Sequence, residues 1–340
     1  MKRVCFGRTG LQVSRIGIGG IPIIPLSVDE AVSIIKEAIR LDINFIDTAN
    51  RYRNSEEKIG LAIKGVPRDE IVLASKSGAS DKQTFNNHLD QSLRALGVDF
   101  IDIYQLHNID AKNREAVFAP GGSYEGLVEA IQAGKVRFPA FSCHSCGLAA
   151  EIMREDIFDA VQLPFNYIDA EALVEAIPLA RELNMGFLAM KPMGGGMLYD
   201  AGLAFRYLLQ FEGIVPDPGI EKIEEIQEIV AIVEAAQPFT DEDKAEIARQ
   251  REELKETWCH RCNYCQPCPQ GISITNVLSI KSFLKRYGDE GTKKRLLDAT
   301  ERVSRCLRCY ECVSRCPYSL DIPNLLVKSI DYWKSAFDGS

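Results

Sequence analysis

The chain has 340 residues, of which 46% are hydrophobic, and its 48 acidic against 40 basic side chains give a formal net charge of −8. Its length suits one large domain with a smaller one, and its apolar content supplies a full core. Residues 251–340 hold 15 basic and 11 acidic side chains, a net charge of +4, so the first 250 residues carry −12. Because an acidic body repels phosphate, we expect no nucleic-acid partner.

The N-terminal residues, MKRVCFGRTG, contain neither a long apolar stretch nor a small-residue cleavage site. We therefore expect no signal peptide and a cytoplasmic protein. No segment approaches the ~20 apolar residues of a membrane helix, so we expect no membrane partner. Without a secretion signal, 11 cysteines indicate metal binding or catalysis rather than disulfides.

The first 236 residues alternate short apolar runs with longer amphipathic stretches. The amphipathic stretches predict helices at Asp29–Leu41, Ser55–Ile63, Thr84–Leu96 and Ala170–Leu183, among others. The apolar runs predict eight strands, at Arg15–Gly20, Asn44–Asp47, Ile71–Ser77, Phe100–Leu106, Phe138–Cys143, Asp159–Pro164, Gly186–Lys191 and Ile214–Gly219.

Strands that alternate with helices indicate βαβ units and a parallel sheet. Eight units predict a (β/α)8 TIM barrel over residues 1–238. The alternative is a doubly wound open sheet, which requires a glycine-rich phosphate turn after its first strand. Gly17, Gly19 and Gly20 lie inside the first predicted strand, so that motif is not properly placed.

A charged segment, TDEDKAEIARQREELKET, follows the barrel. Its apolar positions are sparse, which predicts a solvated linker helix within residues 239–257. Eight of the 11 cysteines follow it, so we expect a small α-rich domain over residues 258–340. The basic side chains of this region can balance the negative charge of thiolate-ligated clusters.

Two cysteine runs stand in this last region. The second, Cys306-Leu-Arg-Cys309-Tyr-Glu-Cys312-Val-Ser-Arg-Cys316-Pro317, has the C-x₂-C-x₂-C-x₃-C-P spacing of bacterial ferredoxins. The first, Cys259-His-Arg-Cys262-Asn-Tyr-Cys265-Gln-Pro-Cys268-Pro269, is one residue shorter before its last cysteine. Two zinc knuckles are the alternative, but three consecutive C-x₂ steps suit a cubic cluster better. The runs therefore predict a ferredoxin-like domain with two [4Fe–4S] clusters.

In two-cluster ferredoxins the cysteine before proline ligates the other cluster. By that logic Cys316 completes one cluster and Cys268 completes the other, although the short first run leaves open whether Cys268 reaches. The first predicted set is Cys259, Cys262, Cys265 and Cys316, and the second is Cys306, Cys309, Cys312 and Cys268. Cys5, Cys143 and Cys146 lie outside both runs, and we expect them to be small buried residues.

Four polar residues fall near the ends of successive predicted strands, where TIM-barrel chemistry is located. Asp47 ends the second strand and Tyr52 follows it, Lys76 lies at the end of the third, and His107 follows the fourth. Each alone is more often a packing or surface residue. Together they form a plausible set for proton transfer.

The sequence around these residues resembles the aldo-keto reductases. FGRTGLQVSRIGIGG is similar to their N-terminal hairpin, and FIDTA-x-x-Y-x-x-SE-x-x-IG is similar to their second-strand signature. The resemblance covers residues 4–236, and the cysteine-rich tail looks like that of an iron–sulfur-fused branch. It implies a catalytic tetrad of Asp47, Tyr52, Lys76 and His107 and hydride transfer from a nicotinamide to a carbonyl. In this scheme Lys76 lowers the pKa of Tyr52, Asp47 keeps Lys76 charged, and His107 orients the carbonyl.

The resemblance also implies a nucleotide site. Ser142 and Gln162 match residues that hold the nicotinamide carboxamide, while Cys143 and Met190 depart from the usual asparagine and tyrosine. Lys191, Met193 and the run Gly194–Gly196 resemble a loop that passes the pyrophosphate. The eighth-strand segment VPDPGIEKIEEIQEI supplies Gly219, Ile220, Lys222 and Glu228 around the adenosine end. NADP-preferring members place cations where this chain has Gly219 and Glu225, so we expect NAD(H) rather than NADP(H).

Two functions remain open from the sequence. One is an oxidoreductase acting on a small-molecule carbonyl or alcohol, with clusters that exchange electrons with the barrel or a redox partner protein. The other is an electron-transfer protein whose barrel binds a flavin or a partner. A separate alternative is that the clusters are purely structural. The tetrad favours the first, although a hydride carries two electrons and each cluster carries one.

Overall fold

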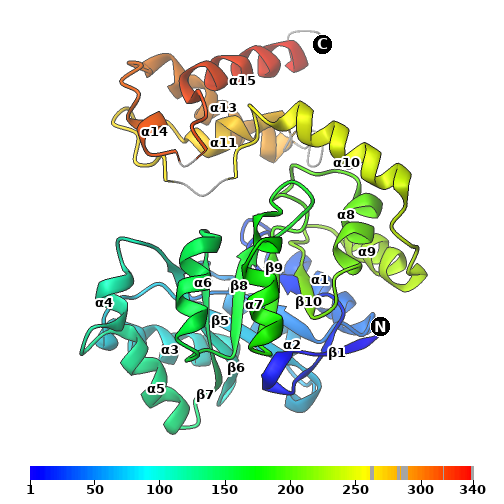
Figure 1. Ribbon diagram of the computed structural model, residues 1–340, viewed down its shortest axis with the longest axis vertical. Coiled ribbons are helices and arrows are strands. Elements are labelled where there is room, and N and C mark those ends of the chain that lie inside the picture. The colour runs from blue at the N-terminus through cyan, green and yellow to red at the C-terminus, as the bar shows by residue number, and fades with distance from the viewer. Residues whose placement is uncertain (261–263, 282–283, 285–289, 317, 338–340) are drawn as a thin grey trace. The chain divides into compact units, whose positions relative to one another are not determined.

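The computed structural model describes residues 1–260, 264–281, 284, 290–316 and 318–337. The chain divides into two compact units. The first comprises Met1–Pro192 and Ala201–Phe239, and the second comprises Met193–Asp200 and Thr240–Ser340. Figure 1 draws the first unit in blue to green and most of the second in yellow to red.

The first unit contains one sheet of eight parallel strands that follow each other in chain order, with helices around them (Figure 1). Every predicted strand is present, and the predicted TIM barrel is confirmed. The strands are β3 (Ile18–Gly19), β4 (Phe45–Asp47), β5 (Val72–Ser77), β6 (Ile101–Ile109), β7 (Val136–Cys143), β8 (Ala160–Pro164), β9 (Gly186–Met190) and β10 (Ile214–Asp217).

The barrel closes between its first and last strands. Gly19 pairs with Gly219 in a parallel bridge. The amides of Gly17 and Gly19 donate to the carbonyls of Pro216 and Pro218, each at 2.8 Å. Proline has no N–H to return such a bond, so the pairing at this seam is sparse and β3 is shorter than predicted.

Three predicted helices are found as α1 (Val28–Arg40), α2 (Ser55–Ile63) and α3 (Lys82–Leu96). The predicted helix Ala170–Leu183 is instead a 3-10 turn, η3 (Glu171–Leu173), followed by α7 (Ala176–Glu182). Pro178 explains the break, because its ring conflicts with the carbonyl four residues earlier. The unit also contains η1 (Gly7–Thr9), η2 (Arg68–Glu70), α4 (Arg114–Phe118), α5 (Ser123–Gln132), α6 (Cys146–Arg154), α8 (Ala201–Leu209) and α9 (Ile223–Ala235).

An antiparallel hairpin of β1 (Arg3–Cys5) and β2 (Gln12–Ser14) precedes the barrel. Its Phe6, Leu11 and Val13 share an apolar cluster with one or two residues from each of β4 to β10. Phe6 packs edge-on against Phe45 at 5.3 Å between ring centroids. Apolar side chains therefore fill the barrel near the hairpin, while Asp47, Lys76 and Gln162 come later along their strands.

The regular elements described in the second unit are helices, joined by turns and irregular segments. The predicted linker helix is α10 (Asp241–Leu254), which begins with a capping box between Thr240 and Asp243. The other elements are α11 (Ile274–Leu278), α13 (Glu290–Glu301), η4 (Arg302–Arg305), α14 (Glu311–Ser314) and α15 (Ile322–Phe337). Within the described part of the chain, no helix has the length and apolarity for crossing a membrane.

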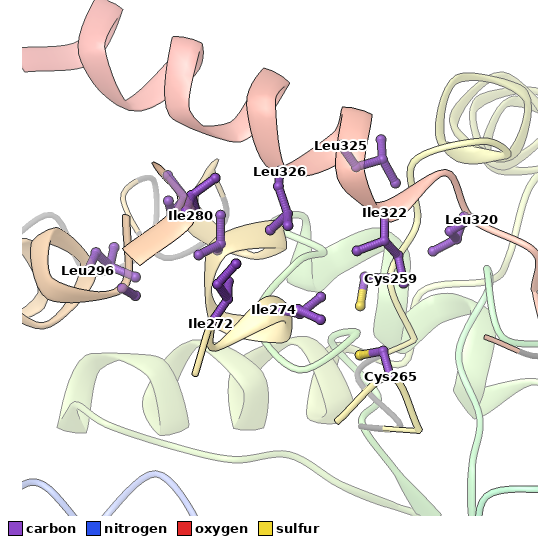
Figure 2. Packing of buried hydrophobic residues seen from close by; sticks show 13 residues of the cluster. Cys259, Cys265, Ile272, Ile274, Ile280, Leu296, Leu320, Ile322, Leu325 and Leu326 are labelled. Atoms are coloured by element: carbon purple, nitrogen blue, oxygen red, sulfur yellow. The ribbon is translucent and has the colours of Figure 1, made fainter. Parts of the chain in front are cut away.

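A separate apolar core holds the second unit together. Ile322, Leu325 and Leu326 of α15 pack with Ile274 and other buried residues of this unit. Figure 2 shows Ile322 and Leu326 pointing toward α11, with Cys259 and Cys265 at the edge of the same cluster. Cys259 and Cys265 of the first cysteine run are thus held by burial beside this core.

Candidate functional site

The centre of the barrel site is a buried ion pair. Asp47 ends β4, and its Oδ2 lies 2.5 Å from the Nζ of Lys76 on β5. Lys76 also donates to the carbonyl of Thr48 at 2.6 Å. Burial is the largest effect and works to lower the pKa of Lys76, but the charge and hydrogen bond of Asp47, with the charges of Tyr52 and Asp217, together outweigh it and the pKa is raised. Lys76 is therefore a fixed cation with a fixed counter-ion.

The other two tetrad residues meet beside this pair. Tyr52 lies in the loop after β4, and its ring is 5.7 Å from that of His107, centroid to centroid, in an edge-on arrangement. The Nζ of Lys76 is 5.3 Å from the Tyr52 ring centroid. His107 lies within β6 rather than after it, because pairing with β7 resumes at Ile109 after a register shift. The fold brings all four predicted residues together.

The electrostatics of Tyr52 differ from the expectation. Burial raises the pKa of Tyr52 above its usual value, and the opposing effect of Lys76 is smaller. Lys76 acts to lower the pKa of Tyr52, as expected, but the expectation left out burial, and desolvation penalises the phenolate more than this one cation favours it. Burial likewise holds the pKa of His107 well below its usual value, so the imidazole is neutral. The site offers a protonated phenol and a neutral imidazole.

The remaining polar residues of the second-strand signature hold the backbone around the site. Ser55 donates its hydroxyl to the Gly20 carbonyl at 2.8 Å, and Thr48 bonds to Ser55 at 2.9 Å. The carboxyl of Glu56 accepts from Ser75 at 2.5 Å. The ammonium of Lys58 donates to the carbonyls of Ile23, Ile24 and Leu26 at 2.7–3.0 Å. These contacts fix the loop that follows β3.

One polar residue of this rim was not predicted as part of the site. Asp217 ends β10 and is buried, and the Gln162 amide donates to both Asp47 and Asp217 at 3.2 Å. Gln105 donates to Asp47 at 3.2 Å as well. The sequence did contain a signal for Asp217: it is an aspartate at the end of a barrel strand, as Asp47 is on β4.

The residues predicted for the nicotinamide end lie on neighbouring strands. Ser142, on β7, accepts a hydrogen bond from the Asn108 amide at 2.8 Å. Gln162, on β8, is engaged by the two carboxylates. Lys191 has a positive φ of 58°, and its carbonyl accepts from Asn166 at 3.0 Å.

The glycine run after β9 lies in the second unit. All of Gly194–Gly196 have positive φ, from 57° to 91°, which explains the need for glycine. A Cβ on Gly194 would lie 2.5 Å from the Trp258 ring. Met193, also assigned to this loop, is buried.

The adenosine-end residues are split between buried and exposed positions. Gly219 has no room for a side chain, because a Cβ there would lie 2.4 Å from the Pro22 ring. Ile220 is fully buried. Lys222, the N-cap of α9, and Glu228 are exposed. Glu225 accepts from the Glu221 amide at 2.9 Å, a helix-capping contact. Gly219 and Ile220 therefore shape the backbone, and Lys222 and Glu228 can reach a ligand.

The described cysteines of the second unit line two pockets. The first, with about 380 Å³ of empty space, is lined by Cys268, Cys306, Cys309 and Cys312. Gln266 fixes the backbone beside Cys268 by accepting from the Cys268 amide at 3.0 Å and donating to the Ile272 carbonyl at 2.9 Å. Four cysteines around one pocket offer the ligand set of a [4Fe–4S] cluster.

The second pocket, with about 310 Å³ of empty space, is lined by Cys259, Cys265 and Cys316. His260 and Tyr318 also line it, with their rings stacked at 3.4 Å. Cys262, the fourth predicted member, lies outside the described residues. No three His, Cys, Asp or Glu side chains in the described ranges are grouped closely enough for a single metal ion.

The three cysteines outside the runs differ from one another. Cys143 and Cys146 are buried, as expected, and burial raises the pKa of their thiols to about 11 and about 12. Cys5 is exposed, so its expected burial is wrong. It lies on a two-stranded hairpin, and one face of such a sheet is open to solvent.

Comparisons with known proteins agree with this geometry. Residues 15–202 match the model of the aldo/keto reductase family, and residues 258–321 match that of a 4Fe-4S dicluster domain. The chain belongs to the aldo/keto reductase family and carries a C-terminal 4Fe-4S dicluster domain. This confirms the resemblance and both fold classes.

Several curated relatives align with the barrel. An L-galactose dehydrogenase of Arabidopsis thaliana is 27% identical, over 58% of this chain and 66% of its own. An uncharacterized oxidoreductase of Bacillus subtilis is 31% identical, over 58% and 68%. An NADH-specific methylglyoxal reductase of Escherichia coli is 28% identical, over 58% and 69%. The chain thus spans just under two thirds of the length of the plant enzyme.

Solved structures share the fold. An aldo-keto reductase from Bacillus halodurans in its holo form superposes with a TM-score of 0.63 at 25% identity, covering 73% of this chain and 96% of its own. A Klebsiella pneumoniae aldo-keto reductase in complex with NADPH gives 0.64 at 21% identity, covering 74% and 95%. The latter likeness establishes the barrel fold alone.

Proposed function

We propose that the barrel catalyses the nicotinamide-dependent interconversion of a small-molecule carbonyl and its alcohol. The observation that carries the proposal is the buried Lys76–Asp47 ion pair, 2.5 Å between Nζ and Oδ2, beside Tyr52 and His107. The Escherichia coli relative is named for reduction of methylglyoxal and the plant relative for oxidation of a sugar. Both names fit a carbonyl/alcohol pair.

The residues divide the work as follows. A bound nicotinamide supplies or accepts the hydride. Tyr52 is protonated at neutral pH, since burial raises a pKa that is already about 10, and it donates its proton to the oxygen that gains charge as the carbonyl is reduced. Lys76 stabilises the phenolate that remains, and Asp47 keeps Lys76 charged and in place. His107, a neutral imidazole, donates a hydrogen bond that orients the carbonyl oxygen.

The test is a steady-state assay with a panel of small aldehydes and ketones, comparing Lys76→Met with Lys64→Met. Lys64 is an exposed lysine of the same barrel and serves as the matched control. We expect wild type and Lys64→Met to oxidise NADH with at least one carbonyl, and Lys76→Met to be slower by about 100-fold or more. Equal rates for the two lysine variants would contradict the proposal.

For the second unit we propose that the two pockets each hold a [4Fe–4S] cluster. Cys268, Cys306, Cys309 and Cys312 would ligate one, and Cys259, Cys262, Cys265 and Cys316 the other. The support is the dicluster-domain match together with the cysteines that line each pocket. Of these cysteines, Cys309 is exposed, which suits electron exchange at the surface with a redox partner protein.

A second candidate function is electron transfer in which the barrel binds a flavin or a partner. Two cluster pockets favour it, since one cluster suffices to tie a small domain together. Dithionite-reduced protein mixed with substrate, without nicotinamide, separates the two functions. Reoxidation of the clusters by substrate supports the electron-transfer function, and clusters that stay reduced with substrate, both without and with nicotinamide, leave carbonyl chemistry to the barrel alone.

A further inference from the structure

Asp217 is a buried carboxyl group that the proposed mechanism does not use. It ends β10, and a single amide, that of Gln162, donates 3.2 Å hydrogen bonds to its Oδ2 and to the Oδ2 of Asp47. Both Oδ2 atoms therefore lie within hydrogen-bonding distance of the same nitrogen. Two buried carboxyls that share one donor in this way cannot both carry a negative charge without a large energetic cost. One proton must therefore be assigned to the pair.

The hydrogen bonds decide which partner holds the proton. Asp47 accepts from the Lys76 ammonium at 2.5 Å, from Gln105 at 3.2 Å and from Gln162. Asp217 accepts from Gln162, and its Oδ1 is buried with no hydrogen-bond partner among the described residues. Donors, above all a charged one, favour the ionised form of a carboxyl. The negative charge thus belongs on Asp47 and the proton on Asp217.

The neighbouring strand gives Asp217 space but no donors. A Cβ on Gly17 would lie 3.4 Å from its Oδ1, and a Cβ on Gly19 would lie 3.3 Å from its Oδ2. The amides of both glycines are already used in closing the barrel. Burial and then the charge of Asp47 raise the pKa of Asp217 well above its usual value, against a smaller opposing effect of Lys76.

We propose that Asp217 is a positioning residue that holds a proton at neutral pH and donates it as a hydrogen bond to Asp47. Asp47, Asp217 and Lys76 then carry no net charge together, and Asp47 stays bound to Lys76. On rising pH Asp217 loses this proton and adds a second negative charge to the network near Tyr52. That charge raises the pKa of Tyr52 further and makes the phenol a poorer acid.

The titratable groups facing Asp217 are Asp47 from β4 and Lys76 from β5, with Tyr52 in the loop after β4. The neutral amide of Gln162 faces it from β8. The effect on turnover rests on the proposed function. The presence of the shared proton does not, so the two can be tested separately.

The direct test is infrared difference spectroscopy of wild type and Asp217→Asn at pH 7. We expect wild type to show the carbonyl stretch of a neutral carboxylic acid that Asp217→Asn lacks. Glu56→Gln is the matched control, because burial raises the pKa of Glu56 too and its loss should remove a different band. Identical carboxyl bands in wild type and Asp217→Asn would overturn the inference. If Asp217→Asn does not fold, ¹³C NMR of wild type with labelled aspartate replaces this comparison. We expect one aspartate carboxyl to be protonated at pH 7, and a spectrum without such a carboxyl would overturn the inference.

The functional test is the pH dependence of kcat for carbonyl reduction. We expect wild type to lose activity in an ionisation step below that of Tyr52, and Asp217→Asn to lack this step whatever its absolute rate, because an amide does not ionise. The same step in both proteins would overturn the link to Tyr52. If no carbonyl is reduced at all, the infrared result still decides the inference. If carbonyls are reduced but no neutral carboxyl is found, the inference falls and the proposed function stands.

Discussion

The residues of the barrel site are far apart in the sequence, whereas the cysteines of the pockets lie in two short runs. Asp47, Lys76, His107, Gln162 and Asp217 come from five different strands, spread over half of the sequence. The cysteines of the pockets fall within 259–268 and 306–316. Within each cysteine run, local turns bring the thiols close together. The barrel residues, in contrast, meet only because the eight strands pair into one sheet. Changes to the two regions should therefore have separable consequences.

The largest expected effect is on the barrel, from Tyr52→Phe. Removing the phenolic proton donor should lower kcat for carbonyl reduction by about 10²–10⁴-fold, while nucleotide binding persists. Steady-state kinetics and fluorescence titration measure the two effects. The matched control is Tyr104→Phe, since Tyr104 is also buried in the barrel but its hydroxyl contacts Ser92 at 3.3 Å. A Tyr52→Phe rate within a few-fold of wild type would remove Tyr52 from its role.

Acid should weaken the barrel before the second unit. Burial and Lys191 hold the pKa of His144 at about 3, against about 6.5 in an unfolded chain. As the pH falls below 6.5, the unfolded barrel binds a proton that the folded barrel does not, so stability is lost. For each such histidine the free energy of unfolding falls by up to about 1.4 kcal/mol per pH unit, which is about ten-fold in the unfolding equilibrium. The lowered pKa of His107 adds an effect of the same sign.

The two units can be followed separately in this experiment. Both tryptophans, Trp258 and Trp333, lie in the second unit, so fluorescence reports on that unit while circular dichroism is dominated by the larger barrel. Urea unfolding between pH 7 and pH 4 should show the stability loss in the dichroism, with a shallower slope in His144→Gln. An unchanged slope in this variant would contradict the assignment to His144.

A smaller effect is expected in nucleotide choice. Pro22 leaves no space for a cation at position 219, and Glu221 and Glu225 lie near the exposed Lys222. One carboxylate near a 2′-phosphate costs ~1 kcal/mol at 4 Å in water, which predicts about five-fold weaker binding of NADPH than of NADH. Fluorescence titration with both nucleotides measures it. Ten-fold tighter NADPH binding would show that this loop does not bind the adenosine end as proposed.

The smallest change, a factor of two, is expected in the iron content of the second unit. Wild type should contain about eight iron and eight sulfide per chain, and Cys309→Ser should retain about four of each, because one cluster loses a ligand. Cys143→Ser, in the barrel, should keep both clusters. Iron and acid-labile sulfide assays decide it. Stoichiometric zinc without sulfide would contradict the cluster proposal.

Local patterns predicted much of this molecule. All eight strands appear because each apolar run is long enough for a barrel strand and is bounded by turn residues. The tetrad residues lie near strand ends, as predicted. The single helix predicted over Ala170–Leu183 is wrong because the apolar periodicity ignores Pro178. The pKa of Tyr52 was misjudged because Lys76 is visible in the sequence, whereas the burial that outweighs it is not.

The sequence by itself determined the barrel, the helical cysteine domain and the positions of the four tetrad residues, because periodicity and short motifs act over a few residues. The tertiary structure alone decided that Asp217 and Asp47 share the amide of Gln162. That arrangement depends on the last strand closing onto Gly17 and Gly19. The tertiary structure also decided that Cys268 reaches the pocket of the second cysteine run, which the short first run had left open. Contacts between distant segments depend on the packing of the whole unit, which no local pattern records.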